Sequence, residues 1–378
     1  MMKKVYYIGW YISDKDKSKY RGNVPGNLKM HYVVDQLLSS GFAPEIISFA
    51  SRIGYNSIYC SITTESQGCR LTYLGGISME GRLVKRLDLL LKKILFTYYF
   101  IFKFKKQDTI VLYHSVAITN LIAKLKKLVN RKVILEVEEI YGYSAVADKP
   151  WVGNEIESIK QMDYYICVND GMPRELNLEG GKYVVSFGVG RIPKRKTKRF
   201  NDGNIHVVYA GTIEMKKLGA LTAVEAARHF PPKYVLHILG FGSEESMQKL
   251  QKRIAEINGE IGYERVQYNG YKSGKELDEF LFSCHIGLSS NVMRPNFANN
   301  TFPSKVITYM CHDLSVVLGY AKAFYDVPMS KGWQFYYEHT PEAIAKAVSN
   351  VEIKPVGYYL PSIECMNSQL QSFFKKYC

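Results

Sequence analysis

Short apolar runs alternate with longer stretches of helical periodicity along most of the chain. This alternation is typical of buried parallel strands connected by crossover helices. In the first half it predicts strands over residues 5–11, 43–49, 109–113, 133–137, 164–168 and 184–187, and helices over 27–39, 82–104, 117–128 and 154–161. Together these elements predict one doubly wound α/β domain over residues 1–190.

A second alternation follows a polar, basic stretch over residues 191–204, which has no periodicity and is typical of a linker. It predicts strands over 206–210, 235–239, 266–269, 285–288 and 314–318, and helices over 218–229, 244–257, 275–283 and 305–311. We therefore expect a second domain over 205–360, and over 361–378 an amphipathic helix that packs back on the first domain. The predicted fold class is α/β, with two Rossmann-like domains facing a cleft in which ligands bind.

Composition narrows the function classes. The chain has 378 residues, of which 47% are hydrophobic and 22% charged, and this balance excludes disordered, collagen-like and small disulfide-stapled proteins. Seven scattered cysteines without metal-ligand spacing indicate reduced thiols in a cytoplasmic protein. The most apolar stretch, 94–102, is much shorter than the roughly 20 residues of a membrane-spanning helix. The formal net charge of +15 indicates an anionic partner, which could be nucleic acid, a lipid surface or a phosphorylated small molecule.

Two glycine turns follow the first two strands of the second domain. Gly211 and Thr212 come directly after strand 206–210, and Lys216 and Lys217 stand at the entrance of the next helix. A glycine turn, a helix N-terminus and two lysines favour an anion site for phosphates, although a plain strand-to-helix turn fits equally well. Gly240 and Gly242 follow the next strand and would let a ligand approach the backbone, as would any packing turn.

A third candidate stretch begins the predicted helix 305–311. It contains Phe302, Pro303, Ser304, Lys305 and Thr308. A proline and a serine at the first turn, with a lysine beside them, suit a diphosphate. A capped helix alone would not explain the lysine, because the helix dipole disfavours a cation there.

The first domain supplies candidates at the ends of its strands. His114 closes strand 109–113, where cleft residues project, although a lone histidine is more often structural. Glu138 and Glu139 follow strand 133–137, and either carboxylate could bind acceptor hydroxyls or stabilise positive charge in an oxocarbenium-like transition state. Plain surface exposure of these glutamates remains an alternative.

The loop after the first strand contains four further candidate residues, which are Gly9, Arg21, Gly26 and Asn27. A surface loop without a ligand is equally compatible with them.

At these motifs the chain resembles the bacterial glycosyltransferases of the two-Rossmann-domain (GT-B) architecture, especially family 4 and related enzymes of capsule and O-antigen polysaccharide assembly. The resemblance covers the second domain well and the first only loosely. It rests on 208–212 with Lys217 downstream, on 237–242, and on 302–310.

The resemblance implies a role for each motif. Lys217 and the Gly211 turn would hold the pyrophosphate of a nucleoside-diphosphate sugar, Gly240 and Gly242 would border its nucleotide, and Ser304 with Lys305 would contact phosphate or sugar. His114 would be the active-site histidine, and the glycine-bearing loop of the first domain would lie over the donor phosphates and face the acceptor.

The sequence departs from the family at two places. Many members carry two glutamates separated by seven residues where this chain has Asn300 and Thr308, and many carry an arginine where it has Thr212. The first change puts recognition of the ribose by a carboxylate in doubt. The second leaves more of the phosphate neutralisation to Lys216 or Lys217.

Basic residues bracket the apolar and aromatic run near residues 94–102. They are Arg82, Lys85, Arg86, Lys92, Lys93, Lys103, Lys105 and Lys106. This composition predicts an interfacial helix on an anionic membrane surface. A crossover helix that buries its apolar face in the domain is the alternative, and single-stranded nucleic acid is disfavoured because the chain contains no recognisable nucleic-acid module.

The resemblance thus predicts a retaining glycosyltransferase that moves a sugar from a nucleoside-diphosphate sugar to a lipid-linked glycan at the inner face of the cell membrane. We expect no cofactor and no metal, because lysines and helix N-termini could neutralise the leaving diphosphate. The rival hypotheses are a nucleotide-sugar epimerase of the same fold and a non-catalytic basic protein that binds membranes or nucleic acid.

Overall fold

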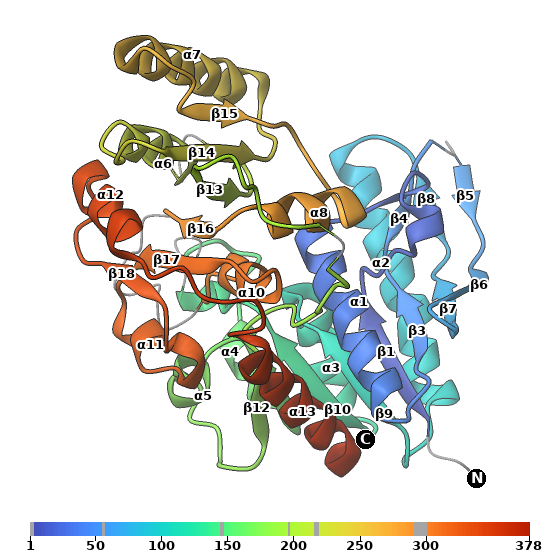
Figure 1. Cartoon of the computed structure of the whole chain (residues 1–378). Coiled ribbons are helices and arrows are strands. Elements are labelled where there is room, and N and C mark those ends of the chain that lie inside the picture. The colour runs from blue at the N-terminus through green and yellow to red at the C-terminus, as the bar shows by residue number, and fades with distance from the viewer. Residues whose placement is uncertain (1–3, 55–56, 144–146, 196, 215–218, 291–300) are drawn as a thin grey trace. The chain divides into compact units, whose positions relative to one another are not determined.

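The computed structural model describes residues 4–378 except 55–56, 144–146, 196, 215–218 and 291–300. The chain divides into two compact units (Figure 1). The first comprises residues 1–189 and 366–378, and the second comprises residues 190–365.

The first unit is built on a sheet with the strand order β12-β11-β10-β9-β1-β3-β7-β6. Its strands are β1 (Val5–Gly9), β3 (Glu45–Ser48), β6 (Ile62–Ser66), β7 (Cys69–Tyr73), β9 (Thr109–Tyr113), β10 (Lys132–Val137), β11 (Tyr164–Cys167) and β12 (Tyr183–Val185). All neighbouring strands are parallel except β6 and β7. The strand order reverses between β1 and β9, which is the point where doubly wound folds bind ligands.

The antiparallel strands of this unit were not predicted from the sequence. The hairpin β6–β7 and the short pairs β2 (Tyr20–Arg21) with β4 (Ser51–Arg52) and β5 (Ser57–Tyr59) with β8 (Gly76–Ser78) had no predicted counterpart. These strands are short, and β6 consists mostly of polar residues that carry no strand signal.

The helices of the first unit largely follow the prediction. They are α1 (Val24–Ser39), α2 (Arg82–Tyr98), α3 (Val116–Lys126), α4 (Glu155–Ile159), α5 (Gly171–Glu175) and, from residue 366 on, α13 (Leu360–Tyr377). The prediction that α1 begins at residue 27 was wrong, because Asn23 caps the helix and Pro25 fits its first turn. The helix predicted over 82–104 ends at Tyr98 and continues as one π-helical turn, Tyr99–Lys103.

The last helix, α13, joins the core of the first unit. Its Leu370 and Phe374 are buried in the same cluster as residues of β1 and α1. The Tyr32 hydroxyl donates to the Asn367 side chain over 2.8 Å, and Lys132 donates to the Tyr377 carbonyl over 3.0 Å. The end of the chain therefore packs with the beginning.

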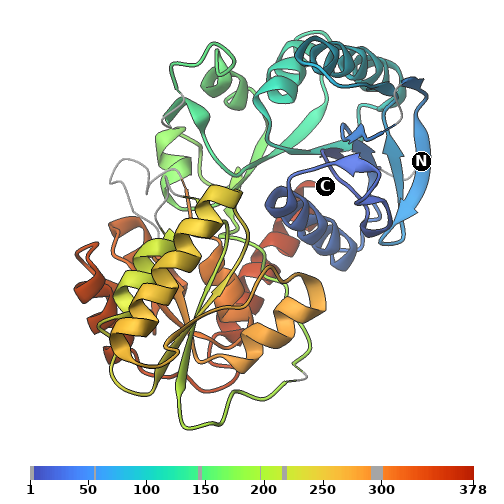
Figure 2. The same cartoon turned by 90° about the horizontal axis from the view of Figure 1, so that it is seen from above.

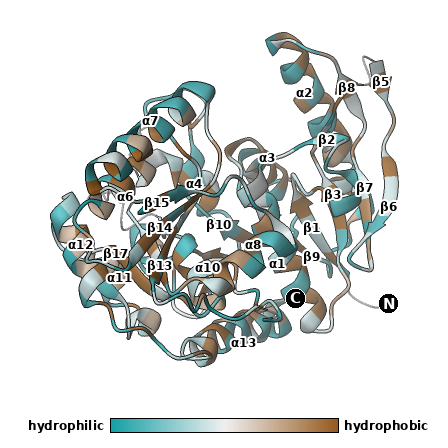
Figure 3. Cartoon of the chain, turned by 45° about the horizontal axis from the view of Figure 1, so that its top comes forward, coloured by the Kyte–Doolittle hydropathy of each residue, from teal (hydrophilic) through white to brown (hydrophobic). Residues whose placement is uncertain are grey.

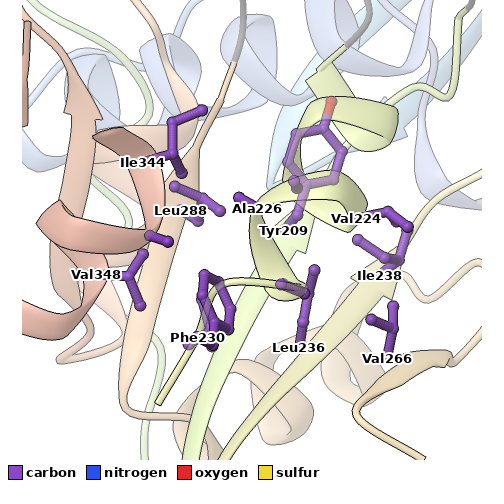
Figure 4. Close-up of a cluster of buried hydrophobic side chains, with 14 of the residues drawn as sticks. Tyr209, Val224, Ala226, Phe230, Leu236, Ile238, Val266, Leu288, Ile344 and Val348 are labelled. Carbon is purple, nitrogen blue, oxygen red and sulfur yellow. The ribbon is translucent and has the colours of Figure 1, made fainter. Parts of the chain in front are cut away.

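The second unit contains a parallel sheet in the order β15-β14-β13-β16-β17-β18. Its strands are β13 (Ile205–Ala210), β14 (Tyr234–Leu239), β15 (Val266–Tyr268), β16 (Ile286–Ser289), β17 (Ser315–Gly319) and β18 (Gln334–Tyr336). Its helices are α6 (Gly219–Ala227), α7 (Glu244–Ile261), α8 (Gly274–Ser283), α10 (Lys305–Cys311), α11 (Lys322–Tyr325) and α12 (Pro341–Asn350). The helices flank this sheet (Figure 2), and side chains such as Tyr209, Leu236 and Ile344 fill its core (Figure 4).

The stretch predicted as a linker lies on the second unit and is bound to it by its arginines. Arg191 pairs with Asp278 over 2.7 Å and Arg195 pairs with Asp313 over 3.0 Å. Arg199 donates to the carbonyls of Asp313 and Lys354. These bonds fix the basic stretch to α8 and to the loops that precede β17 and α13.

The glycine turns after β13 and β14 touch each other. Gly240 has a φ of +149°, and a Cβ there would overlap the carbonyl oxygen of Gly211. The Gly211 N–H donates to the Leu239 carbonyl over 2.9 Å, and Ile213 and Gly242 form one further parallel bridge. The two turns therefore form one hydrogen-bonded layer at the carboxyl edge of the sheet, and only glycine fits at position 240.

We predict that Gly240→Ala lowers the free energy of unfolding by about 3 kcal/mol, because the methyl group meets backbone and the φ value is strained. Gly259→Ala is the matched control, since Gly259 lies in α7 with open space at its Cβ position. There we expect a gain of about 0.5–1 kcal/mol. Urea unfolding of both variants measures the two effects, and equal stability of the two would contradict this view of the turn.

Candidate functional site

In the second unit, the glycine turns and Lys305 come together. Lys305 begins α10, and its Nζ lies 4.0 Å from the centre of the Tyr209 ring. A Cβ on Gly211 would overlap this Nζ and Cε, so the half-buried lysine side chain lies directly against the turn. We call Gly211, Gly240, Gly242 and Lys305 the glycine-turn cluster.

The buried side chain of Tyr309 holds the elements of this cluster together. The Tyr309 hydroxyl accepts a hydrogen bond from the Ala210 N–H over 3.0 Å and donates to the Leu288 carbonyl over 3.2 Å. It thereby ties α10 to the carboxyl ends of β13 and β16, between which the strand order of this sheet reverses. The cluster thus stands at the place where a doubly wound sheet binds ligands.

The other residues predicted to bind the donor differ in how far they are buried. Ser304 is exposed, and its hydroxyl does not cap α10. Thr212 and Thr308 are partly buried, as is Pro303. Phe302 is buried between the rings of Phe324 and Trp333, so it is a packing residue of the second unit.

Lys216, Lys217 and Asn300, which the sequence singled out, lie outside the described residues. Their part in the site therefore stays a prediction. Gly242 belongs to the layer of glycine turns, because a Cβ there would overlap the Ile213 carbonyl.

Two aromatic residues that the sequence analysis missed stand at the same edge. Phe241 follows β14 and Tyr271 follows β15, and their rings meet edge to face at 5.1 Å. They are 49% and 50% exposed, which is unusual for such large apolar side chains beside a turn. The position of Phe241 between the two turn glycines was a signal that could have identified it.

In the first unit, His114 is buried and held by the loop after β10. The backbone N–H of His114 donates to the Glu136 carbonyl. The ring atom Nδ1 lies 3.0 Å from the Glu139 carbonyl oxygen. Because a carbonyl only accepts, Nδ1 carries the hydrogen and Nε2 carries the lone pair. Burial lowers the pKa of His114 to about 4, so the imidazole is neutral at neutral pH.

A second buried group that the sequence analysis missed, Glu155 of α4, faces the other nitrogen of this ring. Its Oε1 lies 3.3 Å from Nε2 of His114, without the alignment of a hydrogen bond. The carboxylate also accepts from the N–H groups of Tyr141 and Gly142, at 3.2 and 2.6 Å. Burial raises the pKa of Glu155, opposed by these two N–H groups.

Glu136 and Glu138 occupy a buried polar cluster beside α1. Glu136 is fully buried, accepts a hydrogen bond from the Tyr7 hydroxyl over 2.9 Å, and has a pKa raised to about 8 by burial and then by the charge of Glu138. Oε1 of Glu138 lies 3.4 Å from Nζ of Lys29, a buried lysine that also donates to the Ser186 carbonyl. Glu138 is therefore paired with Lys29, and both Glu138 and Glu139 are half-buried.

The four candidates of the loop after β1 have mostly structural contacts. Asn27 is buried, and its side chain exchanges two hydrogen bonds with the backbone of Ile12, at 2.8 and 2.9 Å. Arg21, on β2, pairs with Glu80. A Cβ at Gly9 or Gly26 would press on the Tyr113 side chain, so both glycines allow close packing at the end of β9.

An aromatic pair, Tyr141 and Trp151, lies next to His114. The Tyr141 ring lies 6.0 Å from the His114 ring and 5.3 Å from the Trp151 ring, and Trp151 is 53% exposed. The residues that follow the two aromatics along the chain, Gly142 and Val152, line a cavity of about 210 Å³ together with Asn154, Glu155 and Glu157. None of these residues was singled out from the sequence.

Helix α2 exposes its apolar side and buries a charged pair. Lys92 Nζ lies 2.8 Å from Asp88 Oδ2 and donates to the carbonyls of Phe49 and Ala50, while Asp88 accepts from the Ile77 N–H. The exposed apolar residues of α2 and the turn that follows are Leu83, Leu87, Leu90, Leu91, Ile94, Leu95, Tyr98 and Phe102. Apolar and polar positions alternate along α2 in Figure 3. We call this set the α2 stripe.

No helix in the described part of the chain is long and apolar enough to cross a membrane. Among the described residues, no group of three or more His, Cys, Asp or Glu side chains is arranged to hold a metal ion. Asp14 and Asp16 form an Asp-x-Asp sequence in a short 3₁₀ turn, where Asp16 is bound by the Ser13 hydroxyl and Lys19.

Comparisons with known proteins identify the fold. No known protein family and no curated protein matches this sequence. Solved structures match over nearly the whole chain. An α,α-trehalose 6-phosphate synthase from Burkholderia multivorans is 10% identical with a TM-score of 0.67, and the match covers 99% of this chain and 97% of that one.

Two further solved structures are similar to this chain. The lipopolysaccharide outer core galactosyltransferase WaaB is 15% identical with a TM-score of 0.58, covering 99% of this chain and 97% of that one. The Anabaena protein Alr3699/HepE, in complex with UDP, is 10% identical with a TM-score of 0.61, covering 99% and 94%. The chain has the GT-B fold of these glycosyltransferases, and the predicted α/β fold class with two Rossmann-like units is confirmed.

Proposed function

We propose that the protein is a glycosyltransferase that moves a sugar from a nucleoside-diphosphate sugar to a lipid-linked glycan in polysaccharide biosynthesis, with retention and without a metal ion. The observation that carries the proposal is the glycine-turn cluster, in which Lys305 lies against the Gly211 turn at the switch point of the second sheet. The full-length match to glycosyltransferases, one of them bound to UDP, supports it.

The chemistry of the reaction assigns the cluster its role. The bond between the sugar carbon C1 and the diphosphate oxygen breaks, and its electron pair leaves on the diphosphate. The acceptor oxygen bonds to C1, and its proton passes to the leaving diphosphate. Lys305, with Lys216 and Lys217, stabilises the charge that develops on the diphosphate, which is the main electrostatic demand of the step.

The nucleotide is held by the edge around Gly240. A turn without side chains lets the diphosphate reach backbone N–H groups. The exposed rings of Phe241 and Tyr271 offer π faces on which a nucleobase can stack. No metal ion is needed where lysines supply the positive charge.

In the first unit, His114, Glu138 and Glu139 serve the acceptor. Nε2 of the neutral His114 imidazole has no hydrogen-bond partner and can accept a hydrogen bond from an acceptor hydroxyl. Glu138, whose Oε1 lies 3.4 Å from Nζ of Lys29, can stabilise positive charge on the reacting sugar.

The α2 stripe supports the proposal that the protein works at the inner face of the cell membrane. It is an exposed row of large apolar side chains, flanked on the same helix by Arg82, Lys85 and Arg86, which are all exposed. An apolar row between basic residues suits the boundary between acyl chains and anionic headgroups. Such a surface would bring the site to a lipid-linked acceptor.

Nucleoside diphosphates provide the first test. We expect one of UDP, GDP, TDP, CDP and ADP to stabilise the protein by about 2.7 kcal/mol at 100 times its Kd, because it binds only the folded state. Lys305→Ala should weaken that binding at least tenfold, while Lys346→Ala, an exposed lysine of α12, should leave it unchanged. Thermal-shift titrations measure both effects. If none of the five diphosphates stabilises the protein, the donor site is refuted.

Vesicle binding tests the α2 stripe. We expect the protein to sediment with vesicles of phosphatidylcholine and phosphatidylglycerol, and less so at high salt. The double substitution Leu87→Asp, Ile94→Asp should reduce binding at least tenfold, since two exposed apolar anchors become charged. Val356→Asp, at an exposed apolar site of the second unit, is the control. Unchanged binding of the double variant would refute the membrane role of this helix.

The protonation state of His114 predicts a pH effect on stability. The folded imidazole, with a pKa of about 4, binds fewer protons than the unfolded one at about 6.5, so stability is lost as the pH falls through this window. We expect His114 to account for a loss of about 2 kcal/mol between pH 7 and pH 5.

His114→Gln should remove this part of the pH dependence, and urea unfolding at the two pH values measures it. The same variant should slow sugar transfer at least 100-fold while leaving the diphosphate-induced stabilisation intact. An unchanged transfer rate would limit His114 to a structural role.

A further inference from the structure

We propose that Tyr141 and Trp151, next to His114, form a binding site for one uncharged pyranose ring, the terminal sugar of the acceptor. This inference rests on the proposed function, and it adds an aromatic contact for the acceptor sugar to the polar side chains of His114, Glu138 and Glu139.

The aromatic rings form a continuous path from the surface to the buried histidine. Trp151 is 53% exposed, its ring meets that of Tyr141 at 5.3 Å and 68°, and Tyr141 lies 6.0 Å from His114. Large aromatic side chains are usually buried, so an exposed indole supported by a second ring is a feature of binding surfaces. A ligand on this pair would reach toward the neutral ring of His114.

The backbone that carries Tyr141 is held in place by a buried carboxylate. Glu155 has no exposed surface, and its two oxygens accept from the N–H groups of Tyr141 and Gly142. Nε2 of His114 is itself buried and without a hydrogen-bond partner, and it faces the same carboxylate at 3.3 Å. This polar arrangement fixes the loop before any ligand binds, which lowers the cost of ordering it.

The adjacent cavity sets the size of the ligand. Its volume of about 210 Å³ is below the roughly 300–1,000 Å³ typical of sites for drug-sized molecules. It therefore suits a single ring rather than a nucleotide or a lipid tail. Its lining contains the side chains of Asn154 and Glu157, which are exposed and can bond to hydroxyl groups.

The charges of the lining set the chemical class. Two carboxylates, Glu155 and Glu157, border the cavity, so a phosphate or another anion is disfavoured. A pyranose ring has a face of C–H bonds with slight positive charge, which is attracted to the negative face of an aromatic ring, and a rim of hydroxyl groups. An uncharged sugar therefore matches both the aromatic pair and the acidic lining.

Tryptophan fluorescence tests this site directly, because Trp151 is one of three tryptophans in the chain. The probes are the methyl α- and β-glycosides of glucose, galactose, mannose and N-acetylglucosamine, each titrated to the high millimolar range. We expect at least one of them to change the emission saturably. The change should disappear in Trp151→Phe, and Tyr141→Ala should weaken the apparent affinity at least tenfold.

Tyr325→Ala, at an exposed tyrosine of the second unit, is the matched control and should bind as the unsubstituted protein does. Circular dichroism establishes that each variant is folded. The proposal is overturned if no glycoside gives a saturable change, or if the change persists in Trp151→Phe. It is also overturned if UMP or AMP, rather than any glycoside, produces the change, since the rings would then stack on a base.

The outcome is separable from the test of the donor site. Stabilisation by a nucleoside diphosphate without any glycoside signal would leave the proposed transferase standing and refute the sugar site. A glycoside signal without diphosphate stabilisation would indicate a sugar-binding protein and refute the transferase.

Discussion

The parallel pairing of strands is the constraint on which both candidate sites depend. Parallel strands deliver all their following loops to one edge of the sheet, so residues that are far apart in sequence meet there. In the second unit this brings the Gly211 turn, the Gly240 turn and Lys305 together, although almost 100 residues separate the first from the last. In the first unit it brings His114 onto the backbone of Glu136 and Glu139.

Buried charges decide how two helices of the first unit are oriented. Burying an ion is costly unless it is paired and hydrogen-bonded, so a helix that carries such a pair can adopt only one rotation about its axis. Asp88 and Lys92 turn inward on α2, and the leucines on the opposite side must therefore remain exposed. On α1, Lys29 turns inward in the same way and meets Glu138. The α2 stripe is thus a consequence of the polar interior beneath it.

Much of the fold was predictable from sequence because parallel strands are buried on both faces and form apolar runs. The strand Thr109–Tyr113 and the helix Lys305–Cys311 were predicted to the residue. The short strands between residues 51 and 78 were missed, because β6 is mostly polar and its partner β7 obeys no clear alternation. The apolar and basic composition of the α2 stripe was visible in the sequence. The side of the helix that faces solvent was not, because it depends on hydrogen bonds of Asp88 with residues 51 and 77.

Site residues could be predicted from the sequence only where they stand directly after a predicted strand or in a glycine turn. Gly211, Gly240 and His114 belong to this class, and Lys305 was suggested by its misfit with the helix dipole. Glu155 and Trp151 belong to the other class, because nothing in their neighbourhood along the chain distinguishes them. Their proximity to His114 arises from a loop that closes back on the end of β10 through the N–H groups of Tyr141 and Gly142.

The carboxyl edges of the two sheets carry different charged residues. The described edge of the second unit contributes Lys305 beside a bare backbone turn, which favours an anion. The edge of the first unit is rich in glutamates, with Glu136, Glu138, Glu139 and Glu155 within 20 residues. Burial raises the pKa of Glu136 to about 8, and Lys29 pairs with Glu138. Glutamates at one edge disfavour an anion that the lysine at the other edge favours, so the two edges suit ligands of different charge.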